Sequence, residues 1–145
     1  MKPTAPTPPT MLARRVEDLR IFVIGAGPPT DVEWDAHIAH VRAEASSPYG
    51  ILVASDGGTP TTQQRARLAA LEGALRPPTA VLTSSPVVRG VMTVMSWLGG
   101  NLRAFAPDAV DSALEHLRVP SAHRPVVVAT LETLRRRVRG GPRAS

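Results

Sequence analysis

Residues 55–65, SDGGTPTTQQR, place an acid, two glycines and several hydroxyl side chains directly after the apolar run GILVA. Open α/β sheets bind ligands at such a strand-to-helix loop. A phosphate-binding loop would need the pattern G-x-x-x-x-G-K-[ST], in which the lysine neutralises phosphate and the hydroxyl holds magnesium. The chain has no lysine after Lys2, so these residues do not form that loop.

Asp56 could be a phosphoacceptor, because it follows a predicted strand. Receiver chemistry would also need an earlier acidic pair, where Gly25 and Ala26 stand, and a later lysine, which is missing. The stretch GAGPPT at 25–30 imitates the start of a dinucleotide motif, but prolines replace the N–H donors that a pyrophosphate needs. The simpler interpretation of the loop is a turn in which Gly58 relaxes the entry to the next helix.

A histidine-containing stripe is the one candidate for metal binding. Glu33, His37, His40 and Glu44 fall on one side of a predicted helix, at i, i+4, i+7 and i+11. Zinc accepts such ligands, but one helix rarely supplies four of them, and a polar face with Glu–His pairs explains the spacing more simply. The chain has no cysteine and hence no thiolate ligand or disulfide. We expect no metal and no cofactor.

Nucleophilic catalysis also finds little support. Ser84 and Ser85 lie at a predicted strand-to-helix turn, but they lack the pattern of a nucleophile elbow and no histidine is expected beside them. Arg89, one turn into the next helix, could contact an anion at the helix N-terminus or be a solvated surface side chain. Since no nucleophile, acid and base converge, we expect that the chain is not an enzyme.

Composition predicts one domain with a core of aliphatic side chains. The chain has 145 residues, of which 43% are hydrophobic and only 3% aromatic, and this suits parallel strands covered by helices. No apolar stretch approaches the roughly 20 residues of a membrane span, and residues 1–10 lack the apolar segment of a signal peptide. We therefore expect a soluble cytoplasmic protein without a membrane span.

The positive charge is concentrated at the C-terminus. The net charge is +5, yet residues 118–145 hold seven arginines and one glutamate, so the rest of the chain is nearly neutral. This segment is short and has no aromatic anchors, which argues against nucleic acid or anionic lipid as its partner. A helix that docks on the body of the protein, or one that binds a partner or a second copy, fits it better.

Apolar runs alternate with capped amphipathic segments along the chain. MLARRV, RIFVIGAG, GILVAS, TAVLTS and RAFA predict strands, and the segments between them predict helices. The order βαβαβαβα after an initial edge strand predicts an α/β fold with a mostly parallel sheet. We expect a disordered Pro/Thr-rich tail over 1–10, one domain over 11–119, and a basic C-terminal helix with a frayed end over 120–145.

Several helix ends and faces are predicted in detail. Thr30 with Glu33, and Thr61 with Gln64, form capping boxes, and Asp108 is expected to cap a later helix. The C-terminal helix should bury one stripe, made of Val127, Leu131, Leu134 and Val138. Helix 86–98 has two apolar stripes: Val87, Val91, Val94 and Leu98 form one, and Val88, Met92 and Met95 form the other. A helix this apolar must be covered on more than one face, by the C-terminal helix, another subunit or a regulatory protein.

Three segments together resemble the STAS superfamily, and more narrowly the bacterial STAS / CRAL-TRIO-like proteins. They are GILVASDGGTPTTQQRARL, AVLTSSPVVRGVMTVMSWL and RAFAPDAVDSALEHL, within residues 12–118. The resemblance implies a mixed sheet of four or five strands flanked by helices, acting as a binding module rather than an enzyme. Its best-understood members are anti-sigma-factor antagonists, which a kinase inactivates on a serine in the loop that follows a strand.

In this sequence Asp56 matches the aspartate of that regulatory loop, but Gly57 and Gly58 stand at the serine positions. The resemblance therefore implies a switch loop without its usual serine, in which Thr59 could substitute. A phosphate there would be favoured by the N-terminus of the following helix. Thr61 is better explained as the N-cap of that helix.

We accordingly expect a non-enzymatic, STAS-like protein-interaction module in bacterial regulation, with a regulatory protein or a second copy as partner. The expected contact or switch residues are Ser55, Asp56, Gly57, Gly58, Thr59, Thr61, Ser84, Ser85 and Arg89. The alternative is a domain that binds a small ligand or lipid in a pocket between helix 86–98 and the sheet.

Overall fold

The computed structural model describes residues 9–43, 50–71, 78–97 and 101–139. The strands in this part of the chain are β1 Met11–Val16, β2 Leu19–Ile24, β3 Gly50–Ser55, β4 Thr79–Leu82 and β5 Leu102–Phe105. The helices are α1 Asp31–Ala43, α2 Thr62–Ala69, α3 Pro86–Trp97, α4 Val110–His116 and α5 Arg124–Val138, with a short 3-10 helix, η1 Ser121–His123, before the last. Most of the expected disordered tail and frayed end falls on residues 1–8 and 140–145, outside the described residues.

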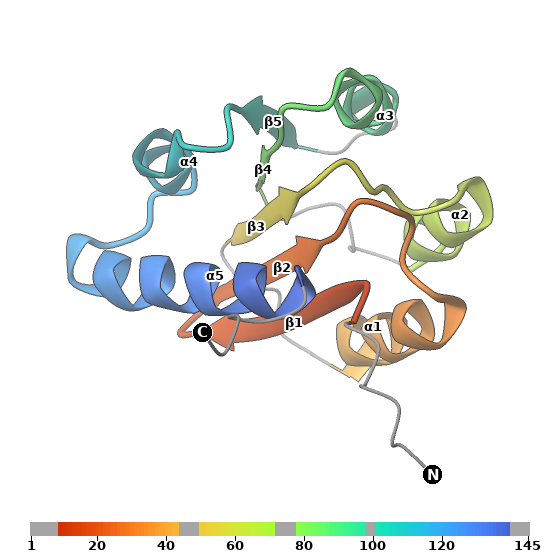
Figure 1. Ribbon diagram of the computed structural model, residues 1–145, viewed down its shortest axis with the longest axis horizontal. Coiled ribbons are helices and arrows are strands. Elements are labelled where there is room, and N and C mark those ends of the chain that lie inside the picture. The colour runs from red at the N-terminus through yellow and green to blue at the C-terminus, as the bar shows by residue number, and fades with distance from the viewer. Residues whose placement is uncertain (1–8, 44–49, 72–77, 98–100, 140–145) are drawn as a thin grey trace, which may run out of the picture.

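One five-stranded sheet organises the molecule. Its strand order is β1-β2-β3-β4-β5, with β1 antiparallel to β2 and every other neighbouring pair parallel. Helices α1, α2 and α3 cover one face, and α4 and α5 cover the other (Figure 1). The predicted α/β fold, with a mostly parallel sheet, an initial edge strand and a C-terminal helix, is confirmed.

The face under α4 and α5 carries the main hydrophobic core. Leu19, Ile21 and Val23, which alternate along β2, are at most 1% exposed, and they pack with Leu114 of α4. Helix α5 joins the same core through its buried stripe, Val127, Leu131, Leu134 and Val138. The predicted buried face of this helix is therefore confirmed, and α5 is an integral layer of the domain.

The face under α1, α2 and α3 is packed less completely. Phe22 of β2 contacts Trp34 and Ile38 of α1, while Ile51 and Val53 in the middle of the sheet are only partly buried. A separate cluster lies under α3 and consists of Val81, Val88 and Met92. Two small clusters thus stand on this face where the other face has one continuous core.

The predicted helix caps are largely present. Gln64 N donates to Thr61 Oγ1 at 3.1 Å, and Thr61 N donates to Gln64 Oε1 at 2.9 Å, so the capping box of α2 is confirmed. At α1 the backbone N–H of Glu33 donates to Thr30 Oγ1 at 3.2 Å, but Thr30 N donates to Thr10 Oγ1 at 3.0 Å and not to Glu33, so only half of the predicted capping box forms. Glu33 also accepts hydrogen bonds from the backbone and hydroxyl of Thr10, which anchors the chain just before β1.

One predicted helix cap is wrong. Helix α4 begins after Ala109 with no side-chain cap, because Asp108 lies one residue too early. On α3, Val88 and Met92 turn toward the sheet, while Val87 of the other apolar stripe is 65% exposed, so whether another subunit or a regulatory protein covers it stays a prediction. Other members of the two stripes lie outside the described side chains: Val91, Val94, Met95 and Leu98.

Candidate functional site

The loop after β3 is held rigidly by its own hydrogen bonds. The Ser55 hydroxyl donates to the Gly58 carbonyl at 2.5 Å and accepts from Gly57 N at 3.1 Å. Asp56 N donates to the carbonyl of Ile24 at 3.0 Å, which ties the loop to the end of β2. The Ser55 side chain is therefore buried and engaged in holding the turn closed.

Gly58 fits its position only because it has no side chain. A Cβ at this residue would lie 2.0 Å from the carbonyl oxygen of Gly27 and 2.6 Å from that of Gly25. The Gly58 N–H donates to the same Gly25 oxygen at 2.8 Å. The two loops after β2 and β3 thus pack backbone against backbone. No serine could occupy residue 58 in this arrangement.

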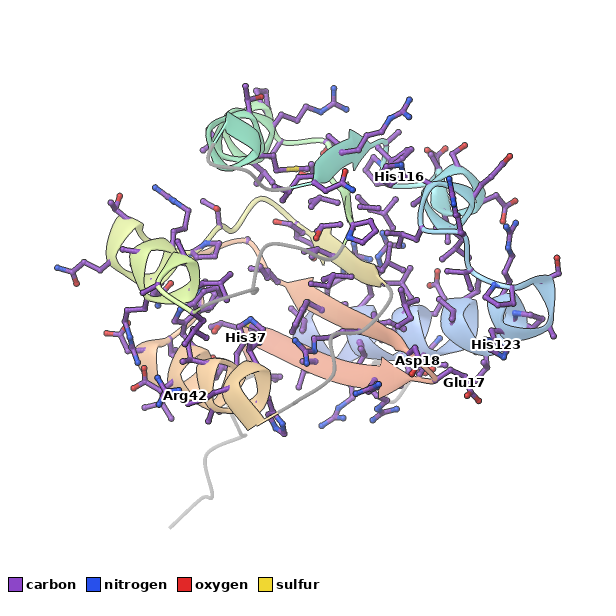
Figure 2. The ribbon with its side chains drawn as sticks, turned by 180° about the vertical axis from the view of Figure 1, so that it is seen from behind. Glu17, Asp18, His37, Arg42, His116 and His123 are labelled. Atoms are coloured by element: carbon purple, nitrogen blue, oxygen red, sulfur yellow. The ribbon has the colours of Figure 1, made fainter. Side chains whose placement is uncertain are left out.

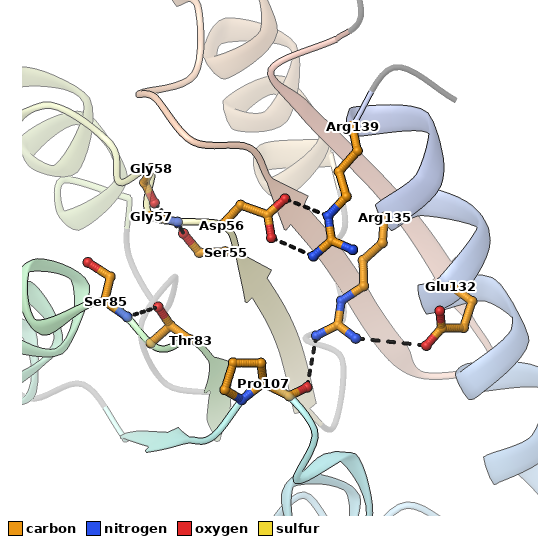
Figure 3. A network of polar contacts seen from close by, with 10 residues as sticks. All are labelled: Ser55, Asp56, Gly57, Gly58, Thr83, Ser85, Pro107, Glu132, Arg135 and Arg139. Carbon is orange, nitrogen blue, oxygen red and sulfur yellow. Dashed lines mark hydrogen bonds and ion pairs between the residues drawn. The ribbon is translucent and has the colours of Figure 1, made fainter. Parts of the chain in front are cut away.

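Asp56 faces the other way, toward the end of α5. Arg139 donates two hydrogen bonds to its carboxylate, at 2.9 and 2.7 Å (Figure 3). These bonds hold the pKa of Asp56 below its usual range against the opposing effect of burial, and they raise the pKa of Arg139. Arg135 lies one turn back, where it donates to the Pro107 carbonyl at 3.1 Å and approaches Glu132 at 3.8 Å. The last turns of α5 are thereby tied to the loops after β3 and β5.

The other predicted contact residues gather at the same edge of the sheet, beyond β3 and β4. Thr61 caps α2, and Ser85 Oγ accepts a 3.3 Å hydrogen bond from the first turn of α3. Thr59 is half-buried, and Ser84 and Arg89 are exposed. The expected surface is therefore brought together, but Ser55, Thr61 and Ser85 have structural hydrogen-bonding roles there.

A pocket of about 130 Å³ lies between the sheet and helices α1, α2 and α3. We call it the interlayer pocket. Its floor is formed by apolar strand residues, namely Phe22, Ile24, Ile51, Val53, Val81 and Leu102. Its roof includes Trp34, Val41, Leu68, Val88 and Met92. Gly58, Thr59 and Pro60 line the end nearest the β3 loop, so the loop and the pocket adjoin.

Two residues of the pocket wall were missed by sequence reasoning. His37, expected on a polar helix face, is 8% exposed, and its ring packs edge-on against Phe22 and Trp34 at 4.4 and 5.0 Å between centroids. In Figure 2 it lies between α1 and the sheet. Burial lowers the pKa of His37 to about 4, assisted by the positive charges of Arg20 and His40. The second missed residue is Arg20. The signal available for it in the sequence was its place as the one charged residue within the run RIFVIGAG.

Gln64 joins α1 and α2, two of the three helices that roof this pocket. Gln64 is only 2% exposed. Its side-chain Nε2 donates to the Pro29 carbonyl and to the Asp31 carboxylate, both at 3.0 Å. The backbone carbonyl of Gln64 accepts a 2.9 Å hydrogen bond from the Trp34 indole. The Trp34 ring is thus fixed in orientation against the pocket.

Neither metal binding nor a membrane span has support in the described residues. They contain no group of three or more His, Cys, Asp or Glu side chains that could hold a metal ion, and Glu44 of the histidine stripe lies outside them. None of their helices is both long enough and apolar enough to cross a bilayer. Comparison of the chain with protein-family models, curated proteins and solved structures finds no match.

Proposed function

We propose that the chain is a non-enzymatic binding module whose interlayer pocket takes a small apolar molecule. The observation that carries this proposal is the unequal packing of the two sheet faces. The α4/α5 face buries Leu19, Leu52 and Leu131 completely, whereas the opposite face leaves about 130 Å³ between its layers. The resemblance to STAS domains, which are binding modules, agrees with this proposal at the level of fold.

The size and lining of the pocket define the kind of ligand. Apolar cavities of about 150 Å³ bind molecules of the size of benzene. The volume favours a compact ring or a short chain over a complete lipid.

Titration with toluene, followed by NMR of the full chain, tests this proposal. We expect saturable shifts of residues that line the pocket, such as Trp34, Val81 and Val88. Val53→Phe fills the pocket from the floor and should abolish the shifts, whereas Val126→Phe, on the exposed side of α5, should leave them unchanged. Absence of saturable shifts in the wild-type chain at millimolar toluene contradicts the proposal, whatever the variants do.

A protein-interaction role in bacterial regulation is the second candidate, favoured by the surface formed by residues 55–61 and 84–89. The loop in this surface is preorganised by backbone contacts, and Val87 beside it is 65% exposed. Among the loop hydroxyls, Thr59 is the one for which a phosphorylation switch is still proposed, since Ser55 is buried and hydrogen-bonded.

Light scattering and affinity capture with Val87→Glu test this second candidate. A dimer or a specific partner that binds the wild-type chain and Val126→Glu, but not Val87→Glu, is the expected result. Both valines are exposed, so the two variants change the same side chain on different surfaces. A monomer that captures nothing, or equal capture by both variants, contradicts the assignment of this surface.

A further inference from the structure

His37 brings an imidazole without a hydrogen-bond partner into the wall of the interlayer pocket. The residue is 8% exposed and lines the pocket. Its ring packs edge-on against Phe22 and Trp34, and in the described part of the chain neither of its ring nitrogens makes a hydrogen bond. A buried polar group without a partner costs free energy, so a molecule in the pocket that hydrogen-bonds to His37 gains affinity from this contact.

The protonation state of His37 restricts the kind of group that can pair with it. Burial is the main cause that lowers the pKa of this residue to about 4, so the ring is neutral at neutral pH. A neutral imidazole has one N–H donor and one acceptor nitrogen. A hydroxyl can accept from the first or donate to the second, and it therefore pairs with either tautomer.

The wall around His37 suits an aromatic ring. Phe22 and Trp34 are aromatic, and Val53, the register partner of Phe22 on β3, is aliphatic. Aromatic rings gain from edge-to-face contact with one another beyond the area that they bury. The Ser55 hydroxyl also lines the pocket, but it is already bonded within its own loop. This part of the pocket is therefore an apolar space with a neutral hydrogen-bonding group at His37.

Resting on the function proposed above, we infer that the interlayer pocket binds a small phenol, whose hydroxyl pairs with His37 and whose ring fills the apolar space. Phenol is benzene with one added hydroxyl. Because apolar cavities of about 150 Å³ bind benzene, a volume of about 130 Å³ matches a ligand of this size. Toluene has nearly the same shape as phenol but cannot hydrogen-bond, so the two molecules isolate the contribution of the hydroxyl.

The experiment titrates phenol and toluene into the full chain at neutral pH, and dissociation constants are taken from NMR shifts. Both should bind the wild-type chain. His37→Leu should bind toluene as before and phenol about tenfold more weakly, because the buried hydroxyl then has no partner. His40→Leu removes an exposed histidine from the same helix and should leave both dissociation constants unchanged. In the wild-type chain, the ring-nitrogen NMR signals of His37 should shift strongly with phenol and little with toluene.

The outcomes separate this inference from the proposed function. A ratio of the two dissociation constants that is the same in His37→Leu and in the wild type overturns the pairing with His37 and leaves the apolar pocket standing. Binding of toluene without binding of phenol has the same consequence. Failure of both molecules to bind overturns the proposed function as well. If His37→Leu does not fold, the nitrogen signals decide, because shifts with phenol no larger than those with toluene overturn the inference.

Discussion

Gly58→Ala is expected to lower the free energy of unfolding by about 4 kcal/mol. Overpacking usually costs about 1–3 kcal/mol, because neighbouring side chains can move aside. Here the added Cβ would meet the carbonyl oxygens of Gly27 and Gly25, at 2.0 and 2.6 Å, and backbone atoms cannot rotate away. The loops must separate, which breaks the 2.8 Å bond from Gly58 N to Gly25 O and strains the Ser55 bonds.

Urea denaturation of matched glycine variants measures this effect. Gly27→Ala, in the facing loop, has no atom within 4 Å of its added Cβ and should change stability little. Gly90→Ala lies within α3, also in open space, and should raise stability by about 1 kcal/mol because alanine favours helix. A loss at Gly58 no larger than the change at Gly27 would show that the two loops are not in close contact.

The close contact between the loops after β2 and β3 explains why residue 58 is a glycine. The sequence places Gly57 and Gly58 together in the loop after β3, but spacing alone does not tell that a side chain at residue 58 is excluded. The facing loop that excludes it is about thirty residues away in the chain, and the separation between the two depends on how β2 and β3 pair. This part of the site therefore needed the structure.

Features determined by local sequence were predictable. The α5 stripe and the Thr61–Gln64 capping box depend on residues within a few turns of one another, and both are present. The Asp108 cap failed by one residue, as helix boundaries do when neighbouring residues could each begin the helix. Local sequence patterns thus predicted the helices and strands and most of their buried faces.

Features that depend on packing between helices were not predictable. His37 falls with Glu33 and His40 on one side of α1, which suggests a polar face, but α1 lies against both the sheet and α2, so its buried face is wider than one stripe. The interlayer pocket depends on the combined placement of three helices. No single segment of the sequence carries a signal for such a space.

Burial of His37 should make the protein markedly less stable in acid. Its pKa is about 4 in the folded chain, against 6.5 for an exposed histidine. Above pH 6.5 both states are neutral, and this residue contributes no pH dependence. As the pH falls from 6.5 to 4, the unfolded chain takes up a proton that the folded chain does not, so stability is lost over this window. The shift corresponds to a loss of about 3 kcal/mol, complete once the pH is below 4.

His37→Leu isolates this effect, because leucine keeps an apolar side chain in the wall of the pocket and does not titrate. Denaturation at pH 7 and at pH 4 should show a loss that is about 3 kcal/mol smaller in His37→Leu than in the wild-type chain. The carboxylates Glu33 and Asp56, whose pKa values are lowered by hydrogen bonds, also destabilise the fold in acid, but they are common to both proteins and cancel in the difference. His40→Leu removes an exposed histidine whose charge is the smallest of the causes that lower the pKa of His37, so its loss of stability in acid should stay close to that of the wild type. An equal loss in His37→Leu and the wild type would mean that His37 is solvated, and that the pocket wall around it is open to water.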